Sequence, residues 1–141
     1  MVDNLSSGTA GATPFDESLI GYTHAIYALH ALSALIGVGS GFTLVFGFIC
    51  GVPSIVAVIM NYARLSATRG TFIESHFRWQ IRTFWFAVLW SLVIAAVSLP
   101  LFLVLIGIPL LWGGFAALTI WIIYRVVRGW LALRDRRPMY I

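Results

Sequence analysis

The stretch that decides the fold runs from Thr83 to Tyr124 and reads TFWFAVLWSLVIAAVSLPLFLVLIGIPLLWGGFAALTIWIIY, without one Asp, Glu, Lys or Arg. A second charge-free stretch runs from Ser18 to Ala63. Placing one Arg at a bilayer centre costs roughly 2.5–3.5 kcal/mol on insertion scales, so such stretches indicate lipid-embedded helices. The composition agrees, because 60% of the 141 residues are hydrophobic and only 10% are charged. We therefore expect an integral membrane protein.

Each charge-free stretch is long enough to cross the membrane twice. One crossing takes about 20 residues, and a helix of about 45 residues would be about 68 Å long against a hydrocarbon core of about 30 Å. Candidate turns lie near the middle of each stretch, at Gly37–Gly41 and at Gly107–Pro109, with Leu99-Pro100 as an alternative for the second turn. We predict an all-α, polytopic membrane protein with four transmembrane helices arranged as two helical hairpins.

The predicted transmembrane domain covers residues 19–130. Its four spans are 19–38, 42–60, 84–106 and 110–127, and a basic cytoplasmic loop, 61–83, joins the two hairpins. Residues 1–18 are rich in Ser, Gly and Thr and are expected to form a disordered cytoplasmic tail. Residues 131–141 are expected to form a basic cytoplasmic tail.

The basic residues set the orientation. All nine are arginines, and every one lies in the central loop or the C-terminal segment. Under the positive-inside rule both regions face the cytoplasm, and an even number of spans returns the N-terminus to that side. We expect a bacterial inner (plasma) membrane, no nucleic-acid partner, and contacts with anionic lipid head groups. Those contacts are predicted for Arg64, Arg69, Arg78, Arg82, Arg125 and Arg128.

The segment before the third span predicts a short amphipathic interfacial helix. Thr71 and Glu74 have the spacing of a capping box, which would start a helix at Phe72. His76 and Gln80 are four residues apart and so lie on one face of that helix. One interpretation is a helix at the head-group level of the membrane. The other is a site for a ligand, an ion or a partner, formed by Glu74, His76 and Gln80.

The first span adds two polar candidates to this site, His24 and Tyr27, which share a helix face. The alternative is an ordinary neutral histidine that is hydrogen-bonded inside the bundle. His24 and His30 are six residues apart and point about 240° from each other, so they cannot together ligate a metal or a haem within this helix. We expect no metal site and no cofactor.

Small residues mark predicted helix-packing faces at Gly47, Gly51, Gly113 and Gly114, because small side chains let helix backbones approach closely. Packing within the monomer and a contact between copies are both compatible with them. The chain has no Gly-rich phosphate loop, no HExxH, no CxxC and no GxSxG. We therefore predict no catalytic residues.

Three short motifs resemble small four-helix membrane proteins related to the Tic-twenty-type subunit of the chloroplast inner-envelope translocon. They are His24-Ala-Ile-Tyr-Ala-Leu, Glu74-Ser-His76, and Gly129 followed by Pro138-Met-Tyr140. The chain departs from that family where Asn-Phe-Gln commonly follows the second histidine, since it reads Arg82-Thr-Phe-Trp. The resemblance implies a membrane subunit or channel-like bundle without a known enzymatic activity.

These residues and motifs support two hypotheses about function. The first is a non-enzymatic membrane protein that acts as an interaction or accessory subunit of an envelope complex, or that associates with itself. The alternative is a small channel or transporter. A pore needs polar residues along its full depth, and only the first span and the His76 and Gln80 face supply them, so we expect such a channel to be oligomeric.

Overall fold

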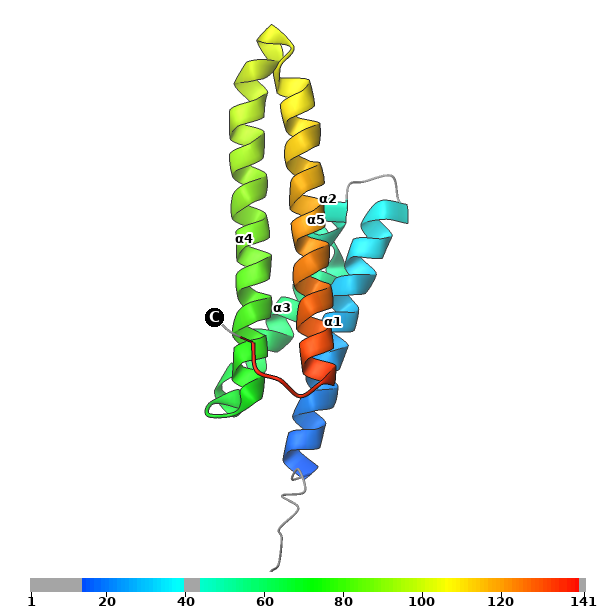
Figure 1. The fold of residues 1–141 in the computed structure, drawn as a ribbon, viewed down its shortest axis with the longest axis vertical. Helices are drawn as coiled ribbons and strands as arrows, with labels where there is room; N and C mark the ends of the chain where they lie inside the picture. The colour runs from blue at the N-terminus through cyan, green and yellow to red at the C-terminus, as the bar shows by residue number, and fades with distance from the viewer. Residues whose placement is uncertain (1–13, 40–43, 140–141) are drawn as a thin grey trace, which may run out of the picture.

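The computed structural model describes residues 14–39 and 44–139, and within these ranges every regular element is a helix (Figure 1). The α-helices are α1 (Pro14–Gly39), α2 (Leu44–Cys50), α3 (Val52–Arg64), α4 (Phe72–Leu101) and α5 (Gly107–Arg134). Two short 3-10 helices, η1 (Leu65–Thr68) and η2 (Phe102–Val104), precede and follow α4. The prediction of an all-α protein is confirmed for the described part of the chain.

Among the described residues, three helical segments are long and apolar enough to cross a membrane: Glu17–Gly37, Phe72–Val104 and Gly107–Arg134. The protein is therefore an integral membrane protein. The predicted span 42–60 is not one helix, because α2 ends at Cys50 and α3 begins at Val52. Between them Gly51 is extended, with φ −67° and ψ 133°. Pro53, in the first turn of α3, has no N–H to continue a helix from α2.

The N-terminal boundary also differs from the prediction. Residues 14–18, which the sequence places in a disordered tail, are the first residues of α1. The rest of that tail and part of the first predicted turn, 37–41, lie outside the described residues. A helix start at Pro14 has a physical reason, because proline is well suited to the first helical turn.

The second predicted turn lies between its two candidate positions. α4 continues through Pro100 to Leu101, and the chain then reverses through η2 and Leu105, whose φ of 60° is left-handed. Gly107 does not end a helix but is the first residue of α5. A side chain at Gly107 would overlap the backbone of Ser98, so its lack of a Cβ allows the hairpin to close.

The predicted interfacial helix and the third span are one continuous helix, α4, which begins at Phe72 as predicted. The reciprocal capping box is not formed. The Thr71 hydroxyl donates to the carbonyl of Thr68 at 2.7 Å. The Glu74 carboxylate instead accepts from the N–H of Gly70 at 3.0 Å and from Arg78 at 2.7 Å. Glu74 thus closes the turn one residue earlier than a capping box would.

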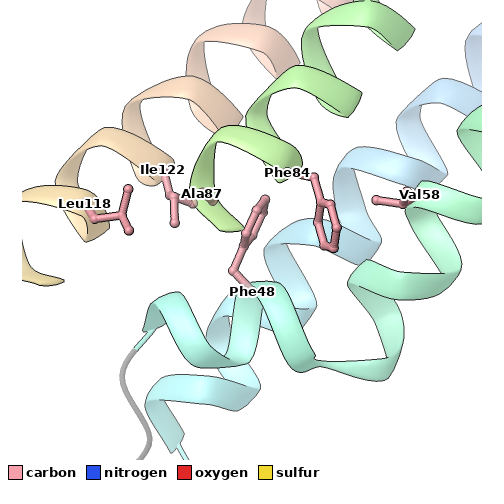
Figure 2. Close-up of a cluster of buried hydrophobic side chains, with 6 residues drawn as sticks. All are labelled: Phe48, Val58, Phe84, Ala87, Leu118 and Ile122. Carbon is pink, nitrogen blue, oxygen red and sulfur yellow. The ribbon is translucent and has the colours of Figure 1, made fainter. Parts of the chain in front are cut away.

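Two apolar clusters hold the helices together. One joins α2, α3, α4 and α5, and Figure 2 shows the Phe48 ring between Phe84 and the α5 side chains. Its buried members are Phe48, Val58, Phe84, Ala87, Leu118 and Ile122. The other joins α1 and α3 to the start of α4 through Leu19, Ile26, Ala57, Ile73 and Phe77. The buried α4 residues of the two clusters lie between Ile73 and Ala87, so none comes from the last 14 residues of that helix.

The two hairpins reach to different heights. His30 of α1 and Gln80 of α4 line the same cavity and are therefore level. Beyond them α1 ends at Gly39, about 14 Å further at 1.5 Å per residue, whereas α4 ends at Leu101, about 32 Å further. Figure 1 shows α4 and α5 extending well beyond α1 and α2. We call residues 96–113 the distal hairpin.

The predicted packing glycines fall into two groups. A side chain at Gly47 or Gly51 would overlap Ser33 of α1, and one at Gly114 would press on Ile94 of α4. These three glycines pack within the monomer. Gly113, in contrast, has nothing within 4 Å of the position that a Cβ would take.

This difference generates a stability prediction. Gly47→Ala should lower the free energy of unfolding by about 1–3 kcal/mol, because α1 presents rigid backbone atoms to the new methyl group. Gly113→Ala is the matched control and should be neutral or stabilising, since alanine favours a helix over glycine by about 1 kcal/mol. Thermal unfolding in detergent measures both, and equal melting temperatures would contradict the packing assigned to Gly47.

Candidate functional site

Polar side chains are buried between α1, α4 and α5, at the arginine end of the molecule. On α4 they follow helical spacing, which places His76, Gln80 and Thr83 on one inward face. We call the set of Tyr27, His30, His76, Gln80, Thr83 and Arg125 the polar cluster. All but Arg125 are less than 4% exposed.

His76 connects three segments of the chain. Its Nδ1 lies 3.1 Å from the Tyr27 hydroxyl, and its Nε2 lies 2.8 Å from the carbonyl of Arg137. A carbonyl can only accept, so Nε2 carries the proton and donates to it. In the neutral ring Nδ1 is then the acceptor, and the Tyr27 hydroxyl donates to it. α1, α4 and the C-terminal segment are thereby joined through one imidazole.

The segment after α5 is held against the start of α4. The N–H of Met139 donates to the Ser75 hydroxyl at 2.9 Å, and Met139 is only 6% exposed. Arg136 forms an ion pair with Glu17 of α1 at 2.9 Å. The described part of the predicted C-terminal tail is therefore packed on the bundle.

His24 and Tyr27, predicted to share a face, both contact Trp130 of α5. The indole N–H donates to His24 Nδ1 at 3.0 Å, and the Tyr27 and Trp130 rings stack with centroids 6.4 Å apart. A side chain at Gly129 would overlap the Tyr27 ring, so this glycine lets α1 and α5 approach. His24 thus belongs to the helix contact beside the polar cluster.

Arg125 is anchored inside the bundle. Its Nε donates to the Thr83 hydroxyl at 2.7 Å, and its guanidinium carbon lies 3.5 Å from the centroid of the Trp79 ring. The Trp79 indole N–H in turn donates to the Arg125 carbonyl at 3.1 Å. Stacking and hydrogen bonding thus hold this partly exposed guanidinium in one place on the bundle.

A small cavity lies at the centre of the polar cluster. It has a volume of about 10 Å³ and is lined by polar groups of His30, Gln80, Thr83 and Arg125, among others. His30 Nδ1 is paired with the Ser54 hydroxyl at 3.0 Å, but His30 Nε2 and both polar atoms of the Gln80 amide have no partner among the described residues. A single water needs about 10–15 Å³ and two to four polar partners. The cavity therefore suits one water molecule.

The structure brings together part of the predicted site. Tyr27, His76 and Gln80 lie in the polar cluster, and His24 lies next to it. Glu74 does not join them, because its carboxylate faces Gly70 and Arg78 at the surface. His24 and His30 have separate partners, and among the described residues no three His, Cys, Asp or Glu side chains are grouped closely enough to hold a metal ion.

Four contributors lie outside the site predicted from the sequence. His30 and Thr83 are polar residues that the sequence does not assign to it, Arg125 is predicted there to contact lipid, and the Arg137 carbonyl is a backbone group that no side-chain pattern indicates. The contacts of Arg125 and of the Arg137 carbonyl with α4 span more than 40 residues of sequence. The i, i+7 spacing of His76 and Thr83 is the one available signal for Thr83.

Comparison of the chain with known protein-family models, with curated proteins and with solved structures gave no match.

The hydrogen bond between Tyr27 and His76 gives the first prediction for this site. Tyr27→Phe removes the only hydrogen available to the buried Nδ1 in this geometry, and should lower the free energy of unfolding by about 1–3 kcal/mol. Tyr62→Phe is the control, because Tyr62 is 52% exposed and water can replace its hydroxyl contact with Trp85. Equal losses in chemical denaturation would contradict a structural role for the buried bond.

The docking of the C-terminal segment on α4 leads to a second prediction. Ser75→Ala and His76→Leu each remove a hydrogen-bond partner of residues 137–139, so amide hydrogen exchange at Met139 should become faster. Ser66→Ala, at an exposed position of η1, should leave that rate unchanged. Unchanged exchange in both test variants would show that other contacts hold the segment.

Proposed function

We propose that this chain is a non-enzymatic integral membrane protein that acts as an interaction or accessory subunit of an envelope complex. The observation that carries the proposal is the uncovered state of the distal hairpin. Within 96–113 only Ser98 and Gly107 are buried, and these two face each other at the turn. Every other side chain in this region is partly or fully exposed, and Leu103 is 91% exposed.

A two-helix hairpin that packs against no other helix gains little stabilisation from helix packing in a membrane. Helix association in lipid depends on close packing, and a third and a fourth helix would normally supply it. In the inner part of this protein α1, α2 and α3 do so. Around the distal hairpin the corresponding positions are open, which supports completion by another membrane protein or by a second copy.

The membrane placement belongs to the same proposal. In Figure 1 the arginine-bearing loop and C-terminal segment lie at one end of the molecule, and the uncharged distal hairpin lies at the other. From Arg82 to Val104 is about 33 Å of helix, which matches the roughly 30 Å hydrocarbon core. This supports two crossings by α4 and α5, with the arginines and both termini at the cytoplasmic face of a bacterial inner membrane.

The first hairpin is proposed to enter the same membrane from the same side but to end part way through it. The end of α1 at Gly39 is about 18 Å lower than the end of α4 at Leu101, by helix rise. Among the α1 side chains that the structure describes, the exposed large apolar ones lie toward its C-terminal end, at Leu32, Leu35 and Ile36. Four membrane-embedded segments in two hairpins thus remain the proposal, with unequal depth replacing four full crossings.

The alternative, a small channel or transporter, has weaker support. The polar side chains that would line a pore, including Tyr27 and His76, are engaged with one another, and the cavity between them admits about one water. The resemblance to Tic-twenty-type translocon subunits is compatible with an accessory subunit as well as with a channel-like bundle. Ion flux through liposomes containing the purified monomer would favour the channel.

Association through the distal hairpin can be tested with two matched glycines. Gly113 and Gly21 both have open space where a side chain would begin, but only Gly113 lies on the distal hairpin. Gly113→Phe should abolish recovery of the partner or second copy after mild-detergent purification, whereas Gly21→Phe should not. Mass spectrometry of co-purifying proteins and the mass of the intact particle provide the readout. A wild-type protein that is a lone monomer under gentle extraction would contradict the proposal.

Depth can be tested by labelling single cysteines in a Cys50→Ala background. A cysteine at Arg69 should react with a membrane-impermeant reagent from the cytoplasmic side, and one at Ile108 only from the opposite side. A cysteine at Gly39 should react from neither, because the first hairpin ends within the hydrocarbon. Labelling of Gly39→Cys from the side opposite the arginines would restore four full crossings.

A further inference from the structure

An apolar groove runs along the α4–α5 hairpin on one face. It has a volume of about 420 Å³, within the range of ligand-binding clefts. Trp90 and Ile94 form its α4 wall, and the α5 residues Gly114, Ala117, Leu118 and Trp121 form the floor and the other wall. A groove of this kind, at membrane depth, is accessible to lipid chains.

The groove ends at three arginines on its cytoplasmic side. Arg125 is one helical turn below Trp121, and its guanidinium lies 5.1 Å from the centroid of that ring. Arg82 is two turns below Trp90 on α4, and Arg128 lies beside Tyr124, to which it donates a hydrogen bond. The guanidinium carbons of Arg125 and Arg128 lie 3.5 Å and 5.9 Å from the centroid of the same Trp79 ring, and Arg82 follows Trp79 by three residues on α4.

The positive charges of these three arginines are not neutralised by ion pairs with described carboxylates, whereas those of three other arginines are. Arg78, Arg134 and Arg136 each form an ion pair with a carboxylate. No carboxylate within the described ranges forms one with Arg82, Arg125 or Arg128. Three like charges held together by the fold, with Arg82 and Arg128 exposed, are most stable when an anion lies between them.

We propose that this is a binding site for an anionic phospholipid of the cytoplasmic leaflet. The phosphate is bound by Arg82, Arg125 and Arg128, and one acyl chain lies in the groove against Trp90 and Trp121. The arrangement of arginines and groove supports a lipid. The arginines lie where the phosphate of a lipid would be, and the apolar groove extends from them toward the bilayer centre, where its acyl chain would be. The proposal rests on the membrane placement proposed above, and it separates these arginines from Arg78, although all four are predicted from the sequence to contact lipid.

A free anion and a second protein copy fit the same surface less well. An inorganic phosphate would leave the apolar groove unused. A second copy of this chain would bring its own arginines to the same end, because parallel copies in one membrane share their orientation. Charge complementarity therefore favours the lipid.

The test is native mass spectrometry of the full chain in detergent, titrated with dioleoyl phosphatidylglycerol and, separately, with dioleoyl phosphatidylcholine. The double variant Arg82→Gln with Arg128→Gln should bind phosphatidylglycerol at least about tenfold more weakly, since each arginine near the head group contributes about 1 kcal/mol. The charge-matched control, Arg69→Gln with Arg78→Gln, should bind as the wild type does. Arg125 is left intact because the fold uses it.

A second pair of variants tests the groove. Ala117→Phe fills it and keeps all arginines, so it should also weaken phosphatidylglycerol binding about tenfold. Ala116→Phe is the control, because Ala116 is exposed on the same helix but does not line the groove. Circular dichroism and melting temperatures should show that all four variants are folded. If Ala117→Phe unfolds, Ala117→Leu takes its place, and if the double variant unfolds, the single variants Arg82→Gln and Arg128→Gln take its place.

Several results would overturn the proposal. Equal retention of the two lipids, or equal losses in the two arginine double variants, would show unspecific attraction to the membrane surface. Unchanged binding in Ala117→Phe, together with competition by free glycerol phosphate, would leave only a phosphate site. A dimer that forms without lipid and is lost in Ala117→Phe would assign the groove to a second copy. The phosphatidylglycerol titrations of the arginine variants do not depend on whether a partner binds the distal hairpin, so the two proposals can fail separately.

Discussion

An ionised guanidinium is costly to place in hydrocarbon, and this constraint orders the whole chain. The nine arginines lie between Arg64 and Arg137, and the fold collects them at one end of the molecule. The remaining helix length is apolar and can extend away from them. The buried polar cluster, the docked C-terminal segment and the Glu74 ion pair all lie at the arginine end, where water and head groups can compensate polar atoms that the protein leaves exposed.

The helical architecture follows from local signals that one sequence carries. Charge-free length predicts membrane helices, and Thr71 and Glu74 predict the start of α4 at Phe72, although the hydrogen bonds that form there are different ones. The break at Gly51 is not predictable in the same way. A Gly followed two residues later by Pro is ambiguous, because membrane helices often continue through proline, and neighbouring helices decide whether the freed carbonyls are satisfied. The turn at Leu105 escapes prediction for a related reason, since a left-handed leucine has no sequence signature.

The candidate site is predictable only in part. Positions on one helix follow from residue spacing, whereas contacts between helices do not. Helical spacing places His76 and Gln80 on one face, and likewise His24 and Tyr27. What spacing cannot specify is which face of α1 meets which face of α4, and this depends on the close approach at Gly129 and on the carbonyl of Arg137. Contacts between residues far apart in sequence carry no periodic signal. Glu74 precedes His76 by two residues, which suggests a shared site, yet two residues on a helix point about 200° apart.

The first hairpin is held together by polar contacts around the break at Gly51. A helix that ends inside hydrocarbon leaves backbone carbonyls and N–H groups without intrahelical partners, and each must find one in the protein. Near the upper end of the first hairpin the Ser33 hydroxyl donates to the Gly47 carbonyl at 2.5 Å, and it does so where Gly51 interrupts the helix between α2 and α3. Below it, the pair formed by His30 and Ser54 ties α1 to α3 at the same break. These side-chain bonds tie α1 to α2 and to α3 around Gly51. The side chains of the distal hairpin are apolar apart from the Ser98 hydroxyl and the Trp112 indole N–H, so most of its exposed surface suits apolar neighbours, whether lipid or protein.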